Sequence, residues 1–134
     1  MPSSFDEEVT RLHDFFEAWF SGGDGLSVAD FDDALADDFM IISPDGRLSS
    51  RAEIVHIVEQ ARNSGPVEIS VVTPRLIVDG HVTVGTYEEH QIRAGRSTQR
   101  ISTAVLSVEP DAPGGWLWHL VHETWLPGGA PGQA

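Results

Sequence analysis

Residues 115–127 decide the fold, and they read Gly-Trp-Leu-Trp-His-Leu-Val-His-Glu-Thr-Trp-Leu-Pro. Between the opening glycine and the closing proline stand the aromatic, β-branched and polar residues that favour one long strand. Because side chains of a strand alternate between two faces, Trp118 and His122 should share one face and His119 and Trp125 the other. Both faces are largely apolar with polar tips. We therefore expect one face to line a pocket and the other to contact a second subunit.

Three further strands are expected upstream of this one. Short turns separate them, at Asp79-Gly80, at residues 94–97 and at residues 110–115, so the four strands should form an antiparallel meander. Pro74 lies within the first strand and indicates an edge position or a bulge, since proline has no N–H to donate. The four expected strands are residues 67–78, 81–93, 99–109 and 116–126.

Two capping boxes predict helices in the first half of the chain. Ser4 stands three residues before Glu7, and Ser50 three residues before Glu53, so each pair can satisfy free N–H groups of a first helical turn. Apolar residues at helical spacing follow both pairs. The other expected elements are a short helix from Ser27 that carries Val28, Phe31 and Leu35, and a short strand over residues 39–42 that ends in the turn Ser43-Pro44-Asp45-Gly46.

Composition excludes several classes of protein. The chain has 134 residues, a net charge of −13 and a sequence pI near 4.5, which disfavours nucleic acid and anionic membranes as partners because both need a basic face. It has no cysteine, so disulfides and thiolate sites are excluded. The start lacks the pattern of a signal peptide, and no apolar run could span a bilayer. We expect a cytoplasmic protein. No phosphate loop or dinucleotide motif is present, so no cofactor is expected.

The order of elements predicts an α+β fold in which a cone-shaped, curved, mostly antiparallel sheet wraps around three helices from the N-terminal half. At this point the chain resembles the nuclear transport factor 2-like superfamily, and within it the SnoaL-like and kinase-association-domain branch. The resemblance is carried by Ala36-Asp37-Asp38-Phe39 leading to the turn at Ser43, and by His122-Glu123-Thr124 in the closing strand. It implies a single SnoaL-like domain over residues 1–127. Residues 128–134 are rich in glycine and proline and should form a flexible tail.

One departure from the superfamily bears on chemistry. Ketosteroid isomerases of this fold place a general-base aspartate immediately before a proline, and the position that corresponds here is Ser43. A serine hydroxyl cannot act as a carboxylate base near neutral pH. The tyrosine that such isomerases carry on the first helix is also absent, because the only tyrosine is Tyr87. Isomerase chemistry by that route is disfavoured.

The polar residues of the meander supply the candidate site. If Gly95-Arg96 forms a two-residue turn, Glu88 lies opposite Thr103, and the next turn places Thr103 beside His122. This register predicts a row of Glu88, Thr103 and His122 facing into the cone beside Trp118, where burial would shift a carboxylate and an imidazole toward acid/base function. Structural or solvated roles for these residues remain open, as does pocket lining without chemistry. The expected pocket residues are Trp19, Phe39, Ile41, Glu88, His90, Thr103, Trp118 and His122.

A metal site is not expected, because His119 and His122 fall on opposite faces of a strand. Three functions stay open. The leading one is a SnoaL-like protein that binds a small, largely apolar molecule in its cone. The second is an acid/base enzyme of the cyclase, hydratase/dehydratase or isomerase type that uses His122 and Glu88. The third is a dimerisation or interaction module without chemistry. We also expect a homodimer, because an outer face would otherwise expose the apolar residues Ala104, Leu106, Val108, Val121 and Trp125.

Overall fold

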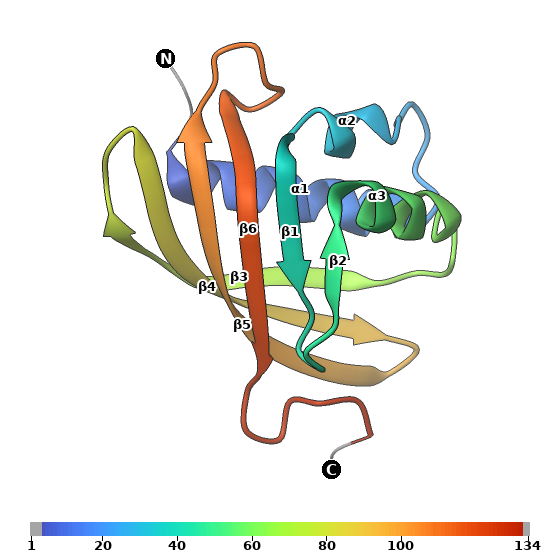
Figure 1. The fold of residues 1–134 in the computed structure, drawn as a ribbon. Helices are drawn as coiled ribbons and strands as arrows, with labels where there is room; N and C mark the ends of the chain where they lie inside the picture. Colours follow the sequence, from blue (N-terminus) through green and yellow to red (C-terminus); the bar gives the residue numbers. More distant parts are fainter. Residues whose placement is uncertain (1–3, 133–134) are drawn as a thin grey trace.

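A single six-stranded sheet bends around the first helix, and two further helices lie beside it (Figure 1). The structure is a computed structural model and describes residues 4–132. The sheet order is β2-β1-β6-β5-β4-β3; β1 and β6 are parallel, and every other neighbouring pair is antiparallel. The elements are α1 (Phe5–Phe20), α2 (Ala29–Asp32), β1 (Leu35–Ile42), β2 (Leu48–Ser50), α3 (Arg51–Gln60), β3 (Glu68–Val78), β4 (Val82–Arg93), β5 (Arg96–Val108) and β6 (Trp116–Trp125).

The predicted α+β fold is confirmed, and so are both helix starts. Ser4 and Ser50 are N-caps whose side chains accept the N–H groups of Glu7 and Glu53, with the reciprocal bonds also present. The second helix is shorter than expected. It ends at Asp32, and Leu35 begins β1, where it pairs with Trp118.

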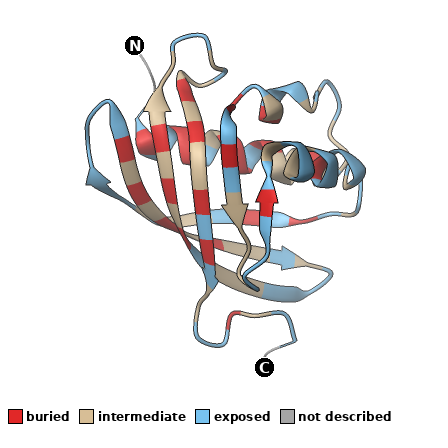
Figure 2. Cartoon of the chain, in the orientation of Figure 1, coloured by how far each residue is buried: buried red, intermediate tan, exposed pale blue. Residues whose placement is uncertain are grey.

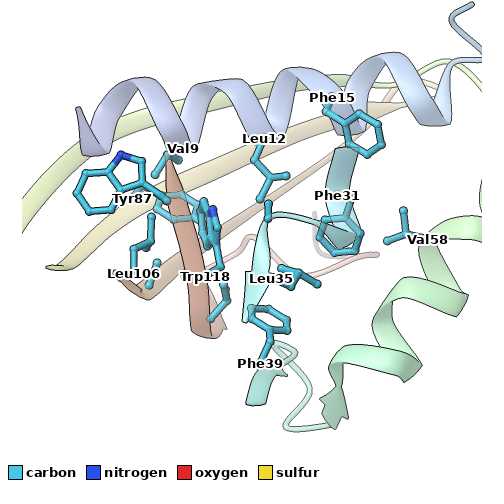
Figure 3. Packing of buried hydrophobic residues seen from close by; sticks show 14 of the residues in the cluster. Val9, Leu12, Phe15, Phe31, Leu35, Phe39, Val58, Tyr87, Leu106 and Trp118 are labelled. Atoms are coloured by element: carbon cyan, nitrogen blue, oxygen red, sulfur yellow. The ribbon is translucent and has the colours of Figure 1, made fainter. Parts of the chain in front are cut away.

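The core lies between α1 and the concave face of the sheet. Val9 and Leu12 of α1 pack against Trp118 of β6 and Tyr87 of β4, all of them buried. Figure 3 shows these side chains converging with those of β1 and α3. Figure 2 shows buried positions alternating with less buried ones along β4, β5 and β6, so these strands have one covered face and one open face.

Pro74 lies where its missing N–H can be tolerated. Strand β3 forms one edge of the sheet, and its pairing with β4 is interrupted between Val72 and Arg75. The neighbouring Thr73 has a φ of +51°, which marks the local kink of a bulge. Both features expected from this proline are therefore confirmed.

The β4–β5 turn differs from the predicted one by one residue. Arg93 pairs with Arg96, so the two turn residues are Ala94 and Gly95, whose φ values of +52° and +75° suit the type I′ turn that matches strand twist. The predicted pairing of Glu88 with Thr103 is therefore wrong. Glu88 pairs with Ile101, and Thr86 takes the place opposite Thr103.

A bulge in β6 has a larger consequence. Leu106 pairs with Trp118 while the preceding Val105 pairs with Leu120, so His119 is an extra residue in β6. One inserted residue reverses the alternation of side chains beyond it. Trp118 is buried, and after the bulge the buried positions are Val121 and Glu123, whereas His122 is exposed. The predicted pairing of Thr103 with His122 is confirmed, but this pair faces outward.

The face of the sheet that was expected to contact a second subunit is the concave face, which the same chain covers. Ala104, Leu106 and Val121 are buried in the core of the single chain. These residues therefore cannot form the exposed apolar patch from which a dimer contact was expected. The expectation that they contact a second subunit is wrong.

The chain after β6 turns back and contacts β5 at Gln99. The N–H of Gln99 donates to the carbonyl oxygen of Gly129, with N and O 2.9 Å apart. Of the tail expected over 128–134, Gln133 and Ala134 lie outside the described residues. Within residues 4–132, no helix is long and apolar enough to cross a membrane.

Candidate functional site

A cavity of about 210 Å³ lies between the concave face of the sheet and the three helices. Most of its wall is aromatic or aliphatic. Phe16 and Phe20 of α1 contribute one side, and Ile54 and Ile57 of α3 contribute another. These four residues repeat at helical spacing of three or four, which explains why each helix presents them together.

Polar side chains gather on one wall of this cavity. They are His13 from α1, Glu89 and Gln91 from β4, Arg100 from β5 and Glu123 from β6. Glu89 and Gln91 are two residues apart and therefore point to the same face of their strand. An apolar cavity with a few convergent polar groups is the usual form of a small-molecule site.

His13 and Glu89 form a buried ion pair. His13 Nε2 lies 2.9 Å from a Glu89 carboxylate oxygen, and His13 Nδ1 donates to the Val9 carbonyl oxygen over 2.7 Å. Burial raises the pKa of Glu89, but the facing His13 and, more weakly, Arg100 and Gln91 lower that pKa to about 2. For His13 the effect of burial has the opposite sign, because burial lowers the pKa of an imidazole. Glu89 and the Val9 carbonyl outweigh this effect, so the pKa of His13 is raised.

This pair is saturated, and that limits its chemistry. Both ring nitrogens of an imidazolium are donors, and both are engaged here. One Glu89 oxygen accepts from His13 and the other from Gln91. His13 has no free lone pair with which to remove a proton from a bound molecule. The pair therefore fixes α1 to β4 and shapes the cavity wall.

Arg100 and Glu123 form a looser pair. Arg100 Nη1 lies 3.4 Å from both carboxylate oxygens of Glu123, whereas charge-assisted hydrogen bonds usually span about 2.7–2.9 Å. Burial raises the pKa of Glu123, and nearby Glu89 adds to that effect, while Arg100 opposes it. Glu123 is thus a cavity carboxyl that can carry a proton at higher pH than an exposed one.

Tyr87 of β4 also contributes a polar group to the cavity wall, and this group is neutral. Burial raises the pKa of Tyr87 well above 10, so its phenol stays protonated at physiological pH. Among the cavity groups, Glu123 is therefore the one that can exchange a proton with a bound molecule.

Three of the expected pocket residues line the cavity. They are Phe39 and Ile41 of β1 and Trp118 of β6. Trp19 is buried instead in the core beside α3, where its indole Nε1 donates to the Val58 carbonyl oxygen over 2.7 Å. Ser43 lies in the turn after β1, and its hydroxyl oxygen accepts the N–H of Arg47.

The other expected residues lie on the convex face, and the expectation that they face the cone is wrong. Glu88 and His90 pair with each other there, with Nε2 and Oε1 3.0 Å apart. Thr103 and His122 are neighbours in the same face. The cause is the bulge at His119, because it breaks the alternation that linked His122 to Trp118.

The expected pocket residues did not include His13, Glu89, Gln91, Arg100 and Glu123. Two signals in the sequence pointed to three of them. His13 lies four residues after Val9 and three before Phe16, within the apolar stripe of α1, where an unpaired polar residue would be costly. Tyr87, Glu89 and Gln91 alternate on one face of β4, but only the strand register identifies that face as the concave one.

Across residues 4–132, no three histidine, aspartate or glutamate side chains come together in a group that could hold a metal ion. The convex His–Glu pair and the concave one lie on opposite faces of β4, so they do not combine.

Comparison with known proteins places the fold. None of the protein-family models matches the sequence, and no curated protein matches it. Solved structures do match. An NTF-2-like protein of unknown function from Pseudomonas aeruginosa superposes with a TM-score of 0.84 at 21% identity, covering 92% of this chain and 98% of that one.

The descriptions of two further structures give each a provisional role. A protein from Thiobacillus denitrificans, described as a calcium/calmodulin-dependent protein kinase type II association domain, gives a TM-score of 0.71 at 18% identity, covering 95% and 98% of the two chains. A structure from Parabacteroides distasonis, described as a ketosteroid isomerase, gives a TM-score of 0.66 at 13% identity. It covers 92% of this chain and 89% of that one. Architecture, strand order and these superpositions agree: the chain has the nuclear transport factor 2-like fold.

Proposed function

We propose that this chain binds a small, largely apolar molecule in the cavity between α1, α3 and the concave face of the sheet. The observation that carries the proposal is the cavity itself, whose wall is mostly aromatic and aliphatic and carries a few polar groups on one side. Desolvation of an apolar ligand by such a wall supplies the affinity, and the polar groups orient it.

The size of the cavity limits the ligand. A cavity of roughly 150 Å³ lined by apolar side chains is large enough to hold benzene, and this one measures about 210 Å³. It therefore suits a molecule with one substituted ring, or a short branched chain of similar volume. Fused ring systems of three or four rings exceed it.

A blocking variant tests this proposal. Ile54→Trp would place an indole in the cavity, whereas Ile92→Trp would add the same group at an exposed position of β4 away from the cavity. We expect single-ring compounds such as benzyl alcohol to raise the melting temperature of the wild type and of Ile92→Trp, and not that of Ile54→Trp. Equal shifts in all three proteins would contradict binding in the cavity.

One observation favours acid/base catalysis as a second candidate. Glu123 lines the cavity and has a raised pKa, which is the property of a general base or acid that operates nearer neutral pH. Exchange of the methyl hydrogens of acetophenone with deuterated water, followed by NMR, tests it directly. Catalysed exchange that Glu123→Gln abolishes would support this role, and exchange at the buffer rate would exclude it for this class of carbon acid.

Self-association is proposed through the convex face. Met40, Leu120, Val105 and Val84 lie side by side across four strands there, and Met40 is 43% exposed. Such an apolar row is typical of an interface, and one structural neighbour is described as an association domain. Sedimentation equilibrium should give twice the chain mass of 14.6 kDa. Val105→Glu should give the monomer, and Ser97→Glu, at an exposed end of β5, should not.

A further inference from the structure

We propose that the cavity selects molecules that carry a carboxylate, with Arg100 as the residue that anchors it. This inference rests on the proposed binding function and names the chemical class of the ligand. It starts from the guanidinium, whose hydrogen-bonding capacity the described chain leaves largely unused.

Arg100 has more donors than partners. A guanidinium carries five N–H donors, and among residues 4–132 the only hydrogen-bond partner of this one is Glu123, 3.4 Å from Nη1. Its Nε is buried and makes no hydrogen bond to any part of the chain between residues 4 and 132. A buried donor without a partner is unfavourable, so an added acceptor that draws the guanidinium toward it would recover that free energy.

The guanidinium is also held in a defined orientation. Its central carbon lies 4.8 Å from the centre of the Trp125 ring, and the side chain as a whole is 18% exposed. Stacking on an aromatic ring restricts the plane of the guanidinium. A planar group held in this way suits two parallel hydrogen bonds to a carboxylate better than it suits a single neutral oxygen.

The charges of the wall allow one more carboxylate. Glu89 is neutralised by His13 at 2.9 Å and is engaged on both oxygens, so it does not compete for Arg100 at hydrogen-bond distance. Glu123 is the direct competitor. Facing it are Arg100 of β5, Glu89 of β4 and His13 of α1, and a protonated Glu123 would release the guanidinium and donate a hydrogen bond to the incoming oxygen.

The rest of the cavity fits the other end of such a molecule. Phe16, Ile54 and Ile57 lie on the helical side of the same cavity that Arg100 lines from the sheet. A ring or short alkyl chain would contact these residues while its carboxylate reaches Arg100. Arylcarboxylates and short branched carboxylates are the classes that match both ends.

Three compounds that differ only in the polar group test the inference: benzoate, benzamide and benzylamine, titrated into the full chain by calorimetry. We expect benzoate to bind at least about tenfold more tightly than the other two, as for a charge-assisted bidentate contact. Affinity for benzoate should fall as the pH rises and Glu123 ionises. Tighter binding of benzamide or benzylamine overturns the inference.

Variants assign the effect to Arg100. Arg100→Gln should weaken benzoate by about tenfold or more and change benzamide by less than about twofold, while Arg96→Gln, at an exposed position of the same strand, should change neither. Glu123→Gln should strengthen benzoate at neutral pH and remove the pH dependence, which keeps the test available if Arg100→Gln folds poorly. Benzamide binding without benzoate binding overturns this inference alone, whereas no binding of any of the three overturns the proposed function as well.

Discussion

Two neighbouring residues of β4, Glu88 and Glu89, each pair with a histidine at nearly the same distance, yet on opposite faces of the sheet. Glu89 lies 2.9 Å from His13 on the concave face, and both side chains are less than one tenth exposed. Glu88 lies 3.0 Å from His90 on the convex face, and both are about one third exposed. The contacts are alike in chemistry and length. Burial is what differs, and it decides how much each pair can contribute to stability or to a site.

The largest effect is expected from breaking the concave pair. Glu89→Ala leaves His13 buried without its carboxylate, and removal of one partner from a buried ion pair costs about 3 kcal/mol or more. The free energy of unfolding, measured by urea denaturation, should fall by that amount. A loss below about 1 kcal/mol would mean that the pair is no more important than an exposed one.

The same pair should control how stability depends on pH. The pKa of His13 is raised above 6.5, so its contribution is complete below pH 6.5 and is lost as the pH rises through the raised value. The pKa of Glu89 is lowered from 4.5 to about 2, so its contribution is complete above pH 4.5 and is lost as the pH falls toward 2. The difference in unfolding free energy between wild type and Glu89→Gln should be greatest between these two limits.

Subtracting the pH dependence of the unfolding free energy of Glu89→Gln from that of the wild type separates the contribution of His13 and Glu89 from that of neighbouring titratable groups. Arg100, Glu123 and Tyr87 face the same cavity, and Glu123 has a raised pKa, so its own contribution is lost as the pH rises above 4.5. A difference curve that is flat from pH 3 to pH 9 would contradict the assignment of linked titration to His13 and Glu89.

The convex pair should matter much less. Glu88→Ala is expected to change the free energy of unfolding by no more than about 1 kcal/mol, and added salt should reduce the change, because exposed ion pairs are screened. The free energy of unfolding of Glu88→Ala and of Glu89→Ala, measured in low salt and in 0.5 M salt, provides the comparison. A loss equal to that of Glu89→Ala would show that the two faces are not distinguished by burial.

The smallest effect is expected at His122. Its side chain is exposed on the convex face, and substitutions at such positions usually change stability by less than about 0.5 kcal/mol. His122→Ala should also leave the binding of single-ring compounds unchanged. Loss of binding would place the site on the convex face after all.

Periodicity and capping were enough to predict the helices, the meander and the α+β class, because each depends on residues close together in the sequence. The caps at Ser4 and Ser50 and the edge position of Pro74 are of this kind. The site depends on register between strands. A shift of one residue reverses a strand's faces, and the extra residue His119 produces that reversal within β6.

A carboxylate–imidazole pair was anticipated, but its two residues were not. A carboxylate and an imidazole in an apolar cone were expected, and such a pair exists, but as Glu89 and His13. His13 lies 76 residues from Glu89 in the sequence, so no local pattern joins them. Only the packing of α1 against the concave face of β4 brings the two together.

NMR of the histidine side chains shows directly on which face of the sheet a ligand binds, because His13 lines the cavity on the concave side whereas His90 and His122 lie on the convex face. Imidazole resonances are recorded while benzoate is added, with His13→Gln and His122→Ala used for assignment. We expect the His13 signals to shift and reach saturation, since His13 lines the cavity, while those of His90 and His122 stay unchanged. A saturable shift at His122 with none at His13 would contradict this expectation.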